Sequence, residues 1–204
     1  MRKYLIEVIG TMALVLAFGL TTEPLALGIA LSALIYMGMY SSGAHFNPAV
    51  SFAYFLRRSI TFRMFLGYSA SQLLGAFAAA GIILMVTHSV FFVEPPTTTN
   101  LYQQVSVEAF LTFLFVSAYL NLINNQHEET FRINALGVGL TLTACIMIGA
   151  TISGGYMNPA MSISTSIIDF MAERGKSFES IPLFTVAPIT GASLAALLHW
   201  YTSD

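Results

Sequence analysis

Two asparagines, Asn47 and Asn158, occupy the same place in two copies of one short segment, Ser-Gly-X-X-X-Asn-Pro-Ala-X-Ser. Asparagine caps helices and proline suits the first helical position, so each copy predicts the start of a helix. A single Asn-Pro is a common turn former. Here, however, the match extends backwards without a gap through Gly28/Gly139, Leu31/Leu142, Ala33/Ala144, Ile35/Ile146 and Gly38/Gly149. The two copies are therefore interpreted as parts of one internal repeat.

The repeated segments offer hydrogen-bonding groups but no fixed charge. A side-chain amide donates two hydrogen bonds, and each helix amino end carries about half a positive charge. Two such ends facing each other repel cations and can bind an uncharged guest. The residues predicted to face the passage are Asn47, Pro48, Ala49, Asn158, Pro159 and Ala160. The backbone carbonyls predicted to accept from the guest belong to Gly43, Ala44, His45, Gly154, Gly155 and Tyr156.

The composition places the chain in a bilayer. Of its 204 residues, 56% are apolar and only 9% are charged, whereas about 25% are charged in a soluble domain. The single cysteine, Cys145, excludes a disulfide framework and a cysteine metal cluster. There is no basic stripe for nucleic acid, and no nucleophile–base set or metal-ligand spacing that indicates an enzyme. We expect no cofactor and no metal.

Six stretches are long enough to cross a membrane, which takes about 20 mostly apolar residues. They lie at about 4–21, 25–41, 64–88, 105–123, 134–151 and 181–201. Two further apolar pieces, about 47–56 and 158–169, begin at the Asn-Pro-Ala boxes and reach only about half-way across at 1.5 Å per residue. Polar breaks separate the stretches, among them Glu94 to Asn100 and Asn124 to Arg132. The short pieces predict two half-helices that start at mid-membrane.

The two halves of the chain must point in opposite directions. Glu7 with Thr11 matches Glu108 with Thr112, and the equivalent spans are separated by an odd number of crossings. The prediction is an all-α membrane protein with six transmembrane helices and two half-helices in an inverted repeat. Residues 1–204 form one transmembrane channel domain, with repeats at about 1–94 and 101–204.

Basic residues give the expected orientation. With the amino terminus inside, the cytoplasmic side holds Arg2, Lys3, Arg57, Arg58, Arg63 and Arg132, against Arg174 and Lys176 outside. We therefore expect a multi-pass integral membrane protein with a cytoplasmic amino terminus, in the plasma (cytoplasmic) membrane. Its partners would be membrane lipid, water and small neutral solutes, and no nucleic acid.

The paired boxes, the Gly-Ala-His-Phe before the first box, Glu7, Glu108 and the segment from Gln72 to Ala76 resemble the aquaporin (major intrinsic protein) family. The resemblance covers nearly the whole chain. It implies a right-handed helix bundle with one pore per subunit, usually a homotetramer, and passive transport without a cofactor. Pores of this type select by diameter, lining hydrogen bonds and half-helix dipoles.

One departure from the family concerns the outer constriction. The family normally has arginine directly after the second box, where this chain has Met161. The resemblance places the other three constriction residues at Leu27, Ile146 and Gly155, so the inferred ring has no side-chain donor. Loss of the arginine could widen the ring for larger neutral solutes, or flexible Met161 could narrow it. We expect Met161→Arg to reduce the flux of larger solutes more than that of water.

Alternative interpretations stay open at this stage. Glu7 and Glu108 either relay protons or, as the family implies, support the backbone of the loops before the boxes. His45 either gates by pH or fixes its loop. The expected function is a passive channel for water and small uncharged solutes. The alternatives are a facilitator mainly for another neutral solute (glycerol, urea or ammonia) and a proton-coupled transporter.

Overall fold

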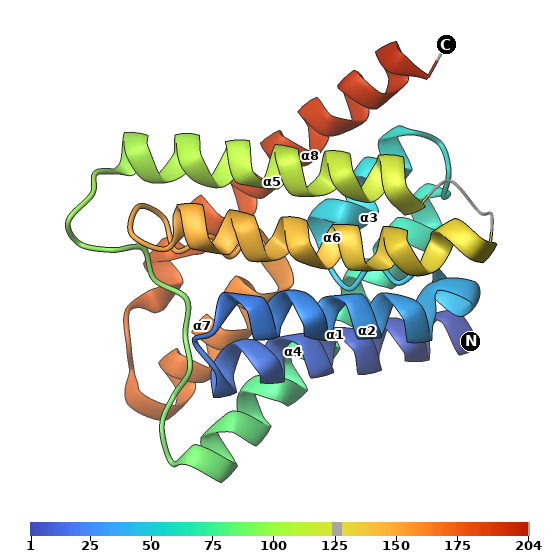
Figure 1. The fold of residues 1–204 in the computed structure, drawn as a ribbon. Coiled ribbons are helices and arrows are strands. Elements are labelled where there is room, and N and C mark those ends of the chain that lie inside the picture. Colours follow the sequence, from blue (N-terminus) through green and yellow to red (C-terminus); the bar gives the residue numbers. More distant parts are fainter. Residues whose placement is uncertain (124–127, 204) are drawn as a thin grey trace.

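The computed structural model describes the backbone of residues 1–123 and 128–203, and the side chains of residues 1–122 and 133–203. Within these residues the protein is helical and has no strand. The six long helices are α1 (Arg2–Leu20), α2 (Pro24–Ser42), α4 (Phe62–Thr87), α5 (Leu101–Ile123), α6 (Glu128–Gly149) and α8 (Leu183–Thr202). The short ones are α3 (Pro48–Leu56), α7 (Pro159–Glu173) and the 3-10 turn η1 (Ser177–Ser180). Six long and two short α-helices confirm the predicted fold class (Figure 1).

The helix boundaries differ from the prediction at three places. Helix α5 begins at Leu101, earlier than expected, and α7 continues to Glu173. Helix α6 begins at Glu128, inside the stretch that was predicted to be a polar loop. The rest of that stretch, residues 124–127, and the side chain of Arg132 lie outside the described residues.

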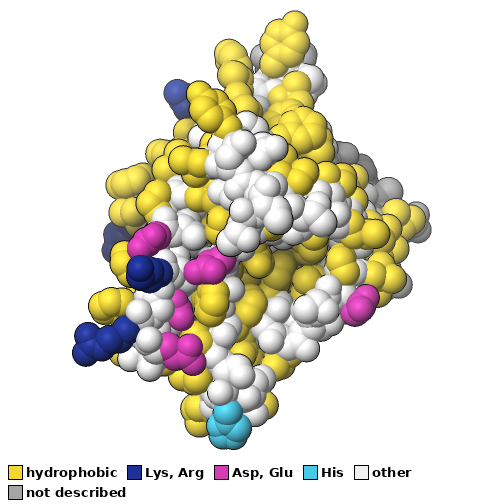
Figure 2. All heavy atoms as spheres, turned by 90° about the vertical axis from the view of Figure 1, so that its left-hand side faces the viewer, with side chains coloured by type: hydrophobic (Ala, Val, Ile, Leu, Met, Phe, Trp, Pro, Cys, Tyr) yellow, Lys and Arg dark blue, Asp and Glu magenta, His cyan; other side chains and the backbone are white. Residues whose placement is uncertain are grey.

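The helices have the length and composition of membrane spans. Helices α1, α2, α4 and α5 and the segment Ser177–Thr202 are each long and apolar enough to cross a bilayer. Helix α6 contributes a shorter apolar stretch, Ile133–Gly149, after a polar first turn. Both termini lie at the same end of the bundle (Figure 1). Figure 2 shows the opposite end, where hydrophobic side chains form most of the outline and the few charged ones lie mainly on one side.

The packing repeats itself between the two halves. Helix α1 packs on α4 as α5 packs on α8, and α1 packs on α2 as α5 packs on α6. The half-helices follow the same rule, because α3 packs on α4 and α8 while α7 packs on α8 and α4. Helices α2 and α6, and likewise α3 and α7, contact each other directly. This is the inverted repeat that the fold class predicts.

Glycines set the closest helix contacts. A Cβ atom on Gly28 of α2 would overlap the backbone carbonyl of Gly139 on α6, and the reverse is also true. A Cβ on Gly75 would overlap the carbonyl of Val8, and one on Gly191 that of Ala109. Small residues allow this close approach where no hydrophobic force drives helices together in lipid.

Candidate functional site: the meeting point of the half-helices

The two half-helices meet through their first residues. Each asparagine caps its own helix: Asn47 Oδ1 accepts from the Ala49 amide at 2.8 Å, and Asn158 Oδ1 accepts from the Ala160 amide at 3.1 Å. Each also donates across the junction. Asn47 Nδ2 donates to the Met157 carbonyl at 2.8 Å, and Asn158 Nδ2 donates to the Phe46 carbonyl at 3.1 Å. The second hydrogen of each side-chain amide is left for a guest.

The segments before the boxes are irregular backbone inside the helix bundle. Ala44, Phe46 and Met157 all have positive φ, at 51°, 50° and 52°. Gly154 and Gly155 also have positive φ, at 99° and 66°. Residues other than glycine rarely adopt a positive φ unless neighbouring groups support the backbone there.

Glu7 supports the first of these segments. One of its carboxylate oxygens accepts from Ser42 Oγ at 2.7 Å and from the His45 amide at 3.0 Å. The other accepts from the Phe46 amide at 2.7 Å and from Gln72 Nε2 at 2.8 Å. Glu7 is fully buried, and every partner donates to it. This is the geometry of a carboxylate that satisfies backbone amides where water is absent.

Glu108 occupies the equivalent position in the second half. It is also fully buried, on α5, and accepts from the backbone amide of Met157. Both glutamates therefore bind the residue that directly precedes a box asparagine. The structure places them behind the irregular segments, and neither carboxylate lines the cavity described below.

His45 is held by side chains of α3 and α4. Its Nδ1 lies 3.0 Å from Ser51 Oγ, and its ring lies 4.4 Å from that of Tyr54 and 5.1 Å from that of Tyr68. The histidine is 3% exposed. It therefore has a fixed ring at one wall of the junction.

A narrow cavity lies at the junction. It offers about 10 Å³ of space for water-sized spheres, which is about what one water molecule needs. Its lining comes from both halves of the chain: Leu14, Phe18, Leu31, His45, Asn47, Phe115, Leu142, Tyr156 and Asn158. The repeat pairs most of these residues, namely Leu14 with Phe115, Leu31 with Leu142, His45 with Tyr156, and Asn47 with Asn158. The predicted meeting of the two asparagines is thus part of a continuous, pseudo-symmetric lining.

The four residues of the predicted outer ring are not part of the lining of this cavity. Leu27, Ile146 and Met161 are 2%, 7% and 0% exposed, and none of the four ring residues lines this cavity. Met161 packs in an apolar cluster with Val15 and Phe184. Gly155 packs against the backbone of α6, where an added Cβ would lie 3.1 Å from the Ile146 Cα. The role of these residues as a constriction stays a prediction.

The structure adds two details to the prediction of which backbone carbonyls accept hydrogen bonds from a guest. The Ala44 carbonyl already accepts a hydrogen bond from the Tyr119 hydroxyl. The carbonyls of Phe46 and Met157, which were not predicted to take part, accept from the asparagines. The sequence did not identify the residues of the apolar wall, which come from α1, α2, α5 and α6. The pair Leu31/Leu142 was visible in the repeat, but nothing in the sequence indicated that it faces the passage.

The described residues contain no group of three His, Cys, Asp or Glu side chains placed to hold a metal ion. The lining is apolar apart from the two amides, the Tyr156 hydroxyl and the His45 ring. Such a wall suits small neutral molecules that pass one at a time.

Comparisons with known proteins agree with this geometry. Residues 12–199 match the sequence model of the family described as Major intrinsic protein. Glycerol uptake facilitator protein-like 6 of Lactiplantibacillus plantarum is 31% identical over 211 residues, which cover 96% of this chain and 95% of that protein. The lens fiber major intrinsic protein of Oryctolagus cuniculus is 33% identical over 180 residues, which cover 86% of this chain and 66% of that protein.

The fold has a counterpart among solved structures. The X-ray structure of the aquaglyceroporin from Plasmodium falciparum superposes with a TM-score of 0.87, covering 99% of this chain and 96% of that one at 20% identity. The match over nearly the whole chain, together with two half-helices that meet at paired asparagines, gives one conclusion: this chain belongs to the major intrinsic protein family and is a transmembrane channel.

Proposed function

We propose that this channel conducts water in single file and passes larger neutral solutes poorly. The observation that carries the proposal is the cavity between the half-helices, which has space for about one water molecule and is lined by both Asn47 and Asn158. Each asparagine keeps one amide hydrogen for the guest. The apolar residues of the lining offer no hydrogen-bonding partner, so at the junction a passing water exchanges its bonds with the few polar groups there, above all the two amides.

Ions are excluded by two effects. The amino ends of α3 and α7 point at the junction, and their dipoles repel cations. No carboxylate lines the cavity to compensate an ion for its lost hydration. Glu7 is occupied by backbone amides, and one oxygen of Glu108 accepts from the Met157 amide, while the other has no partner among the described residues. Because neither carboxylate lines the cavity, the proposed channel is passive rather than proton-coupled. We further propose that it is not an enzyme.

A second candidate is a facilitator mainly for glycerol or a similar solute. It is favoured by the likeness to the Lactiplantibacillus protein, whose name includes glycerol uptake. The small volume of the cavity argues against it, because a glycerol molecule is several times the size of a water molecule.

Stopped-flow light scattering on proteoliposomes separates the two candidates. Water, urea and glycerol gradients are run side by side, with empty liposomes as the control. Water flux well above that of empty liposomes, with little glycerol flux, supports the proposal. Glycerol flux comparable to water flux supports the second candidate. Solute flux that depends on an imposed proton gradient would contradict a passive channel.

The assembly and its placement follow from the family and the charge pattern. We propose a homotetramer in the plasma membrane with the amino terminus inside. The connection between α3 and α4, which contains Arg57 and Arg58, lies at the same end of the bundle as both termini (Figure 1). Light scattering coupled to size exclusion tests the tetramer. Protease access to a tag at the amino terminus in sealed cells tests the orientation.

A further inference from the structure

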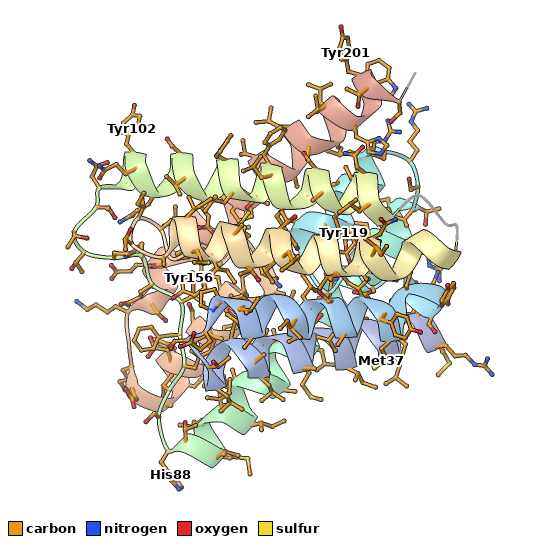
Figure 3. All side chains as sticks on the ribbon, in the orientation of Figure 1. Met37, His88, Tyr102, Tyr119, Tyr156 and Tyr201 are labelled. Carbon is orange, nitrogen blue, oxygen red and sulfur yellow. The ribbon has the colours of Figure 1, made fainter. Side chains whose placement is uncertain are left out.

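Tyr156 places an aromatic ring in the wall of the cavity, next to the second box. The ring centroid lies 6.4 Å from that of Phe18 on α1 and 5.4 Å from that of Phe184 on α8, and the Phe184 contact is edge-on. The Tyr156 ring also lies over Gly154, where an added Cβ would overlap it. The side chain is therefore wedged in one position. Figure 3 shows it inside the bundle, whereas Tyr102 and Tyr201 project away from it.

Tyr156 and Phe18 are the accessible members of the lining. The other seven lining residues are buried, whereas these two are half-buried. These two rings are therefore the part of the lining nearest the surface. No hydrogen bond to the Tyr156 hydroxyl is found among the described residues, so it can bind the passing molecule.

We propose that Tyr156 and Phe18 form the constriction that sets the size limit of this channel, directly outside the paired asparagines. This inference rests on the proposed water conduction and names the side chains responsible for its selectivity. The predicted ring of Leu27, Ile146, Gly155 and Met161 does not line the cavity, and three of its side chains are packed in the protein. The narrowing is instead made by two aromatic rings from α1 and from the segment before α7.

The chemistry of this pair differs from that of a charged constriction. A phenol offers one donor and one acceptor and carries no fixed charge. It can replace one hydrogen bond of a water molecule, while the stiff rings exclude wider solutes. Selection at this point is therefore by size and by one hydrogen bond, and ion exclusion remains with the half-helix dipoles.

The residue equivalent to Tyr156 in the first half of the chain is His45, and it explains why the segment before the first box contributes no such ring to the proposed constriction. The His45 ring is held by Ser51 Oγ and by the Tyr54 and Tyr68 rings. Histidine is smaller than tyrosine and is held against α3 and α4. Of the two equivalent side chains, Tyr156 is therefore the larger.

The test compares solute and water flux in proteoliposomes for Tyr156→Ala, Phe18→Ala and Tyr156→Phe. The matched control is Tyr102→Ala, which removes an 88% exposed tyrosine outside the cavity. We expect the urea-to-water flux ratio to rise on the order of tenfold in both alanine variants. Tyr156→Phe keeps the rings and should leave the ratio within about twofold of wild type while lowering water flux. The control should match wild type.

The outcomes separate this inference from the proposed function. If the wild type conducts no water above empty liposomes, the proposed function is wrong. If the wild type conducts water and both alanine variants also conduct it with an unchanged urea-to-water ratio, the constriction is not Tyr156 and Phe18.

A second measurement covers the case in which the alanine variants do not fold. Tyr156→Cys is made in a Cys145→Ser background, which removes the only native cysteine, a buried one. A methanethiosulfonate reagent added to both sides should lower water flux by about half or more, because the added group fills the narrow part of the passage. Complete labelling, verified by mass spectrometry, with unchanged water flux would overturn the proposal.

Discussion

Phe18 and Tyr119 occupy equivalent positions in the two halves of the chain, since they follow Glu7 and Glu108 at the same spacing. Only Tyr119 has a hydroxyl, and it donates to the Ala44 carbonyl in the segment before the first box. Tyr119 is fully buried and packs edge-on against Tyr54 and Phe115. One half of the repeat thus uses a phenol to hold irregular backbone, and the other uses a phenyl ring as channel wall.

Tyr119→Phe should therefore lower stability by about 1 kcal/mol, because it leaves a buried carbonyl without its donor. The matched control is Tyr54→Phe. The Tyr54 hydroxyl is buried with no partner among the described residues, so its removal should be neutral or slightly stabilising. Thermal unfolding in detergent measures both. Equal losses in the two variants would argue against a structural role for the Tyr119 hydroxyl.

Glu7→Gln should destabilise the segment before the first box by about 3 kcal/mol or more. Glutamine has one acceptor oxygen, so two of the four donors that now face the carboxylate would face an amide nitrogen instead. We expect a lower unfolding temperature together with reduced water flux. Glu23→Gln, at the exposed start of α2, is the control and should behave as wild type. A folded Glu7→Gln variant with full water flux would show that the carboxylate is dispensable.

Gly28→Ala should cost about 1–3 kcal/mol, because the added methyl group would meet the Gly139 backbone and push α2 and α6 apart. Gly81→Ala is the internal comparison. Nothing lies within 4 Å of its Cβ position, and alanine is favoured over glycine in a helix by about 1 kcal/mol. The two variants should therefore shift the unfolding temperature in opposite directions. A neutral Gly28→Ala would mean that the crossing of α2 and α6 is looser than described.

Met161→Arg tests the position where the family normally has arginine. From the sequence alone, the prediction is that this change reduces larger-solute flux more than water flux. Met161 is 0% exposed and packs among apolar side chains, so an arginine would bury a charge that has no partner in that cluster. We now expect mainly a loss of stability, with Met161→Leu close to wild type. A stable Met161→Arg protein with selectively reduced urea flux would restore the ring as the constriction.

The internal repeat allowed much of this architecture to be predicted. The two Asn-Pro-Ala boxes, each at the start of a short apolar piece, predicted where the half-helices begin. The odd number of crossings between the two copies predicted that the half-helices run in opposite directions. Asparagine and proline act locally on backbone conformation, so their positions remain readable without tertiary contacts. The buried glutamates were also visible, because a charge inside an apolar stretch needs a partner.

The sequence by itself thus determined the membrane environment, the helix count and the pairing of Asn47 with Asn158, since each follows from local chemistry and from repeated spacing. Only the tertiary structure decided which way the other side chains face. In the structure, the Met161 side chain packs in an apolar cluster, whereas the Tyr156 side chain lines the cavity. Both residues lie within three positions of the same asparagine, Asn158. Side-chain direction in irregular backbone is set by φ and by the neighbours that fill the remaining space, and those neighbours come from distant helices.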